Sequence, residues 1–151
     1  MHILGNMMGL YFFGPVLEQT LGKNKFLILY FGAGLGGVFL NGLINYLEIS
    51  KLLPSSIEYQ IQMATPMIGA SGAIFGILAA FTKLFPNIKM MIFPIPFEIK
   101  AKYLIPLYAA FEIYSGFFRK DSNIGHFAHI GGLIVGIILI IYWFGWKKKI
   151  F

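Results

Sequence analysis

The chain of 151 residues contains no cysteine, which excludes disulfide bonds, thiolate nucleophiles and zinc or iron–sulfur sites held by cysteine. Charged residues are also scarce: they make up 12% of the chain, against about 25% in a typical soluble domain. Hydrophobic residues instead reach 58%, and the mean hydropathy is +0.75. This composition excludes an ordinary soluble domain and indicates a single membrane-embedded domain over residues 1–151.

The zinc-protease pattern His-Glu-x-x-His is absent as well. His126 and His129 stand three residues apart and could share a helix face, but no obvious third metal ligand accompanies them. Glu112 lies deep in an apolar segment, where it could pair internally or mark a polar track; we favour a structural role. We therefore expect no metal ion and no other cofactor.

The net charge of +6 and the isoelectric point near 9.6 raise the question of a nucleic-acid partner. The lysines, however, lie between apolar runs and not along a stripe interleaved with aromatic residues. This pattern is typical of orientation signals in a membrane protein, so we expect a lipid bilayer and no nucleic acid as the surroundings.

Five apolar segments come close to the ~20 residues that a helix needs to cross a bilayer. They cover residues 3–21, 26–47, 67–85, 101–118 and 124–146. Glycine, asparagine, proline and lysine residues separate them, while the short stretch 90–97 contains two prolines and reads as an interfacial loop. The sequence therefore predicts an all-α polytopic membrane protein with five transmembrane helices.

Lysine and arginine residues are unequally divided between the two sides of such a bundle. If the five spans alternate, one side holds nine of them: Lys23, Lys25, Lys83, Lys89, Lys100, Lys102 and the run 147–149. The other side holds three: Lys51, Arg119 and Lys120. The positive-inside rule then places the C-terminus in the cytoplasm and the start of the first span outside. We expect a multi-pass protein of a bacterial inner (plasma) membrane.

The third span carries a serine in an unusual place. Gly69-Ala70-Ser71-Gly72 heads this segment, and the fourteen residues from Ser71 to Leu84 would reach only about 21 Å as a helix. Either the helix begins at residue 67, or it begins near Ser71, below the membrane surface. Irregular backbone at that depth requires protein or a water-filled cavity beside it. In the second case Ser71 lies at the floor of a cavity that opens to the outside.

A histidine, His129, occupies a matching place near the head of the last span. Both spans continue with small residues four apart, which let helix backbones approach closely in a membrane: Gly72 and Gly76 on one, Gly132 and Gly136 on the other. Phe75, one turn below Ser71, could pack against the imidazole. If Ser71 and His129 meet, they could form a serine nucleophile with its general base. A packing role for the histidine and chance occurrence of the Gly-x-Ser-Gly string are the plainer alternatives.

His2 and Asn6 are four residues apart and share a face at the outer end of the first span. A histidine N–H and an asparagine amide are suitable donors for a developing oxyanion. The alternative is an interfacial histidine and an ordinary helix asparagine.

The ordered set His2-x-x-x-Asn6, Gly69-x-Ser71-Gly72 and Ala128-His129-x-x-Gly132-x-x-x-Gly136 resembles the rhomboid intramembrane serine proteases. The string Phe13-Gly14-Pro15-Val16-Leu17-Glu18 with Leu21-Gly22, and Ile95-Pro96 followed by Lys100-Ala101-Lys102, are also similar to that family. The resemblance implies a dyad of Ser71 and His129 without an acidic third member, and oxyanion donors at His2 and Asn6. It also implies that the substrates are membrane-anchored proteins cleaved near the outer surface.

Rhomboids have six core helices, whereas this sequence shows five, the first helix and the loop after it being absent before Met1. We therefore expect the DNA upstream of Met1 to encode a further apolar span in frame. Two other functional classes stay open. One is a catalytically inactive rhomboid-like binding protein or truncated pseudoprotease; the other is a transporter fragment, against which the lack of an inverted internal repeat speaks.

Overall fold

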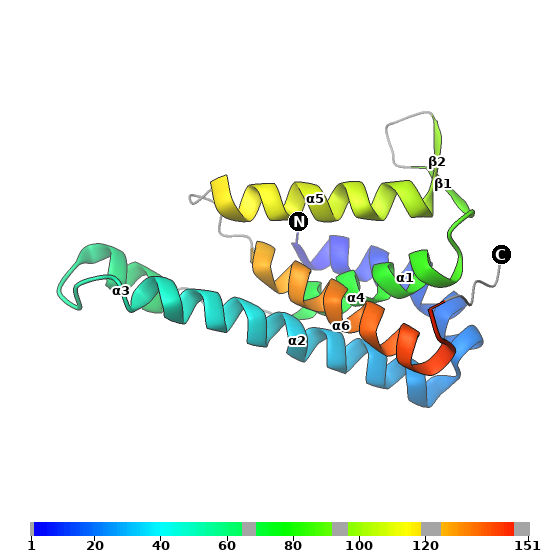
Figure 1. Cartoon of the computed structure of the whole chain (residues 1–151), viewed down its shortest axis with the longest axis horizontal. Helices are drawn as coiled ribbons and strands as arrows, with labels where there is room; N and C mark the ends of the chain where they lie inside the picture. Colours follow the sequence, from blue (N-terminus) through cyan, green and yellow to red (C-terminus); the bar gives the residue numbers. More distant parts are fainter. Residues whose placement is uncertain (1, 65–68, 92–96, 119–124, 147–151) are drawn as a thin grey trace.

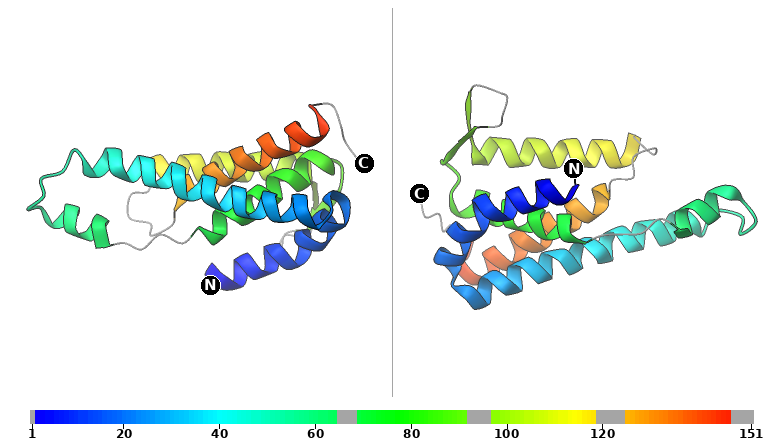
Figure 2. Two further views of the ribbon diagram at one scale, coloured as in Figure 1. Left: turned by 90° about the horizontal axis from the view of Figure 1, so that it is seen from below. Right: turned by 180° about the vertical axis from the view of Figure 1, so that it is seen from behind.

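Long helices make up most of the protein in the computed structural model, which describes residues 2–64, 69–91, 97–118 and 125–146. In chain order the elements are α1 (His2–Leu21), α2 (Lys23–Ile49), α3 (Ile57–Ala64), α4 (Ala70–Leu84), β1 (Lys89–Met91), β2 (Glu98–Lys100), α5 (Ala101–Phe118) and α6 (His126–Phe144). Figure 1 shows that α1, α4 and α6 run in one direction and that α2 and α5 run in the opposite one. The α1–α2 turn and the end of α6 therefore lie at one end of the molecule, and α3 lies at the other (Figures 1 and 2).

The turn between α1 and α2 depends on a glycine. Gly22 has a φ of 80°, a left-handed conformation that side chains disfavour. Its N–H donates to the carbonyl of Glu18 at 2.8 Å, and its own carbonyl accepts from the N–H of Phe26 at 3.0 Å. One residue thus ends α1 and allows α2 to turn back alongside it.

Helix α4 lies at the centre, in contact with α1, α2, α5 and α6. Most of its residues are small or apolar, and its buried positions run from Ser71 to Leu84. Between Phe75 and the C-terminal end of α4, larger side chains of α4 and of the surrounding helices fill the core: Ile77 and Leu84 of α4, Leu17 of α1, Leu29 of α2 and Ile140 of α6 are all fully buried. A helix of small residues can hold four neighbours because their axes can come close to its own.

The outer faces of the helices are covered with large apolar side chains. Those with the largest exposed areas include Ile3, Tyr11, Leu35, Phe39, Leu107 and Tyr142. Among the described residues, α2 and α6 are long and apolar enough to cross a membrane, with mean hydropathies of 1.8 and 2.2. At 1.5 Å per residue the 27 residues of α2 extend about 40 Å and the 15 residues of α4 about 22 Å. The central helix is therefore shorter than a hydrocarbon core of about 30 Å.

Helix boundaries differ from the sequence-based expectation mainly at the third segment. The structure begins α4 at Ala70, with Gly69 at the N-cap, and not at residue 67. Residues 65–68 lie outside the described part. The last helix begins at His126, two residues later than expected, and ends before Gly145, whose φ is 75°.

Three elements were missing from the sequence-based prediction. The stretch 90–97 was expected to be a loop in an all-α protein, but its first two residues belong to β1, and β2 follows it directly. The two strands form a short antiparallel pair in which Met90 lies opposite Ile99. A salt bridge of 2.9 Å between Lys89 Nζ and Glu98 Oε2 joins the two strands. Helix α3 was the third omission, and its signal is Ser56, whose hydroxyl accepts from the N–H of Tyr59 at 3.2 Å as an N-cap side chain does.

Candidate active site

Ser71 is the second residue of α4 and has only 5% of its surface exposed. The first turn of a helix carries backbone N–H groups without partners inside the helix, and its end has a partial positive charge. A hydroxyl at this position therefore lies beside a ready source of hydrogen-bond donors for a negatively charged oxygen.

His129 lies in the first turn of α6, with 4% of its surface exposed. Its imidazole stacks on the ring of Phe75 with the centroids 4.1 Å apart and the planes 3° from parallel. Phe75 is one helical turn beyond Ser71 and shares its face of α4. The same face of α4 thus holds the serine and the ring on which the imidazole rests.

Glycines set the distance between α4 and α6. A β-carbon on Gly132 would collide with the carbonyl of Gly72, and one on Gly136 would lie 2.5 Å from the carbonyl oxygen of Gly76. Both neighbours are backbone atoms, which cannot rotate away as a side chain can. The two glycine pairs singled out in the sequence thus face each other across the two helices.

A third helix, α2, also packs against α4 and α6 at these glycines, and the sequence-based prediction did not include it. A β-carbon on Gly37 of α2 would lie 2.6 Å from the carbonyl oxygen of Ala128 and 3.3 Å from Cα of Gly72. Gly36 likewise lies against Gly131 of α6. The overlooked signal was a pair of small residues four apart, Ala33 and Gly37, the same spacing that identified the glycines of α4 and α6. We call the meeting place of α2, α4 and α6 the glycine junction.

Of the two oxyanion candidates on α1, the structure describes the position of Asn6 but not the side chain of His2. Gly9 of α1 lies against Ile74 of α4, since a β-carbon there would be 2.8 Å from Ile74 Cγ2. Asn6 is half-buried and lies one turn before Gly9, on the side of the contact toward the start of α4. Helices α1 and α4 run in the same direction (Figure 1). Asn6 and Ser71 each precede the contact between Gly9 and Ile74 by three residues, so both lie on its N-terminal side. His2 begins α1, and its side chain lies outside the described residues.

His126 is the second buried histidine of α6, with its ring centroid 6.4 Å from that of His129 and nearly perpendicular to it. Within the described residues no group of three or more histidine, cysteine, aspartate or glutamate side chains is placed to hold a metal ion. The Glu112 side chain lies outside the described part. The chemistry available at the site is therefore that of a hydroxyl, imidazoles and backbone amides.

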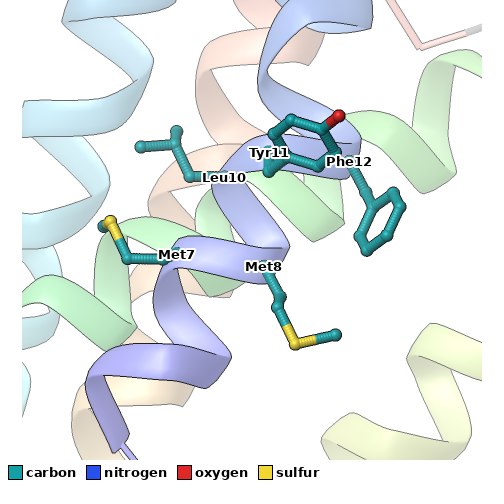
Figure 3. A pocket seen from close by; sticks show the side chains of 5 residues that line it. All are labelled: Met7, Met8, Leu10, Tyr11 and Phe12. Carbon is teal, nitrogen blue, oxygen red and sulfur yellow. The ribbon is translucent and has the colours of Figure 1, made fainter.

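An open apolar hollow of about 540 Å³ lies along α1. Figure 3 shows the side chains that line it: Met7, Met8, Leu10, Tyr11 and Phe12. Methionine and aromatic side chains form a flexible apolar surface that accepts apolar segments of varied shape. The sequence predicts these residues in a membrane span, but no pattern in it indicates the hollow.

Comparison with known proteins identifies the family. A family model described as the rhomboid domain matches residues 1–146. The chain is 32% identical over 146 residues to Rhomboid protease AarA of Providencia stuartii, and 28% identical over 145 residues to the mitochondrial Rhomboid protein 1 of Saccharomyces cerevisiae. It is also 32% identical over 136 residues to Rhomboid protease GluP of Bacillus subtilis.

These alignments cover 93%, 96% and 89% of this chain but only 50%, 37% and 22% of the respective relatives, so the chain spans half of their length or less. No solved structure matches the chain significantly. The family model nevertheless covers all but the last few residues and includes every glycine of the junction, together with Ser71 and His129. The chain belongs to the rhomboid family.

Proposed function

We propose that this chain is an intramembrane serine endopeptidase in which Ser71 is the nucleophile and His129 the general base. One observation carries the proposal. The imidazole of His129 stacks on Phe75, one turn from Ser71 on the same helix, while the glycine junction holds the two helices at backbone contact. A serine becomes a useful nucleophile when a base adjacent to it accepts its proton. The named rhomboid proteases among the relatives support the same reaction class.

The reaction follows from these two side chains. His129 takes the hydroxyl proton of Ser71 as Oγ attacks the carbonyl carbon of a substrate peptide bond, which gives a tetrahedral intermediate with a negatively charged oxygen. His129 then gives that proton to the leaving nitrogen, and the peptide bond breaks to leave an ester on Ser71. A water molecule, deprotonated by His129, then attacks the ester carbonyl. As the bond to Oγ breaks, His129 returns the proton to Oγ, which restores the serine and releases the second product as a carboxylic acid.

Three groups are suited to hold the oxyanion. The backbone N–H groups at the start of α4 lie beside Ser71, and the side-chain amide of Asn6 on α1 is the second candidate. His2 is the third candidate because it precedes Asn6 by one turn. Donors fixed in place before the reaction stabilise the developing charge without having to reorganise.

The membrane arrangement belongs to the same proposal. Residues 1–151 form one rhomboid-like domain in which α1, α2, α4, α5 and α6 cross the bilayer, with the end of α6 in the cytoplasm. The substrates are transmembrane or membrane-anchored proteins, cleaved near the outer surface where α4 begins. The apolar surfaces of α2 and α6 and the excess of lysine at the end where α6 stops support this orientation.

A fluorophosphonate probe tests the nucleophile, because it phosphonylates an activated serine hydroxyl. The full chain, in membranes and in detergent, should be labelled, and Ser71→Ala should abolish the labelling. Ser115→Ala is the matched control, because Ser115 is a buried serine of α5 with 1% of its surface exposed. Equal labelling of both variants would overturn the assignment of Ser71. A folded parent chain without labelling would favour the rhomboid-like binding protein.

A further inference from the structure

The stack on His129 does not end at Phe75. Tyr108 of α5 stacks on Phe75, with the ring centroids 5.2 Å apart and the planes 26° from parallel. Phe111, one turn further along α5, is nearly parallel to Tyr108 at 6.4 Å. We call His129, Phe75, Tyr108 and Phe111 the ring ladder; it connects α6, α4 and α5 through their side chains.

The ladder joins α5 to the ring on which His129 rests, and α5 also packs directly against α6. The glycine junction is formed by α2, α4 and α6, and α5 takes no part in its backbone contacts. Phe75 is buried, with 6% of its surface exposed, whereas Tyr108 has 42% exposed and lies at the rim of the bundle. The ladder thus runs from a buried base to a ring at the protein surface.

We infer that Tyr108 is a positioning residue for His129 and acts through Phe75. This inference rests on the proposed function of His129 as the base. A histidine base works only while one ring nitrogen points at the nucleophile, and rotation of the imidazole plane would turn it away. The ring of Phe75 fixes that plane because it is almost parallel to it, and Tyr108 restricts the rotation of Phe75 in turn. The position of α5 thereby sets the orientation of the base.

Two variants separate the ring of Tyr108 from its hydroxyl. Tyr108→Leu removes the stacking partner, and because aromatic pairs contribute modestly beyond their buried area, kcat should fall about threefold to tenfold with KM unchanged. Tyr108→Phe keeps the ring and should retain the parental kcat; Tyr108→Trp offers a second ring if the leucine variant is unstable. Tyr103→Leu is the matched control, since Tyr103 is an exposed tyrosine of the same helix outside the ladder.

NMR of the His129 imidazole tests the inference independently of protease activity. In protein with ¹³C-labelled histidine, the imidazole resonances of His129, assigned by their loss in His129→Gln, report the ring current of Phe75. Tyr108→Leu should shift them, whereas Tyr103→Leu should not. If the parent chain shows no protease activity, the proposed function fails and this shift alone decides the inference. Unshifted His129 resonances in Tyr108→Leu, or an equal loss of kcat in Tyr108→Phe, would overturn it.

Discussion

The glycine junction and the α1–α5 side of the molecule differ in how their helices pack: through backbone atoms at the junction and through side chains on the α1–α5 side. At the junction, α2, α4 and α6 meet backbone to backbone, and a single β-carbon on Gly37 or Gly132 would meet a carbonyl group. On the other side, α1 and α5 contact α4 through side chains, and large apolar residues such as Tyr11 and Leu107 are exposed. The first region leaves no room for adjustment, whereas the second contains the apolar hollow.

This difference suits the two tasks of the proposed protease. A base and a nucleophile must keep their geometry to a fraction of an ångström, and contacts between backbone atoms of helices resist displacement. A membrane-anchored substrate must instead reach the site from the lipid, which requires a side with apolar surface. The side formed by α1 and α5 has such a surface.

The sharpest way to break the comparison is to add a side chain at the junction. Gly132→Leu should prevent α4 and α6 from packing, because its side chain would have to occupy the space of the Gly72 carbonyl. Overpacking typically costs 1–3 kcal/mol when side chains can move, and backbone contact should raise the cost beyond about 3 kcal/mol. Thermal unfolding in detergent measures the loss. Gly42→Leu on α2, where a β-carbon meets nothing within 4 Å, should change the melting temperature little.

The second prediction removes the base while leaving the junction intact. His129→Ala should lower kcat by about 10²–10⁴, the usual contribution of general acid–base catalysis. The helices should still pack, since the glycines are unchanged, so the melting temperature should stay within a few degrees of the parent. Cleavage of a model transmembrane substrate at near-parental rate would remove His129 from the mechanism.

The third prediction tests whether the side formed by α1 and α5 also takes part in catalysis. Asn6→Ala should lower kcat by about 10²–10³, the typical loss for one oxyanion donor, with KM nearly unchanged. Steady-state kinetics on a peptide or transmembrane substrate provide both constants. A pure rise in KM would instead place Asn6 in substrate docking and restrict catalysis to the junction side. Gly5→Ala is a suitable control, because its β-carbon meets nothing within 4 Å.

The smallest effect is expected at the strand pair outside the bundle. The hydrogen bond to Glu98, and the attraction between the two charges, raise the pKa of Lys89 above its usual value of 10.5. A raised pKa in the folded state means that the pair contributes stability below pH 10.5 and loses it as the pH rises through the higher folded-state pKa. Both groups are exposed, and exposed pairs contribute little. Lys89→Met should therefore leave the melting temperature unchanged at pH 7; a drop of several degrees would contradict this.

Several features of the protein followed from the sequence alone. The five main helices were predicted because each is a long apolar run, and local hydrophobicity is enough to place a helix in a membrane. The structure has a helix in each of the five segments, with α2 two to three residues longer at each end than expected. Among the described residues, α2 and α6 are long and apolar enough to cross a membrane. Ser71, His129 and their glycines were recognised because each pattern lies within a few consecutive residues and can be read directly from the sequence. Their catalytic roles stay predictions.

Tertiary structure decided the features that depend on residues distant in sequence. The part of α2 in the glycine junction, the pairing of β1 with β2 and the position of Tyr108 on Phe75 each join separate segments. A small-residue pair such as Ala33 and Gly37 says that some helix can approach, but not which one. The choice of α4 and α6 for that approach, and of Phe75 as the ring beneath His129, follows only from packing all the helices around α4 at once.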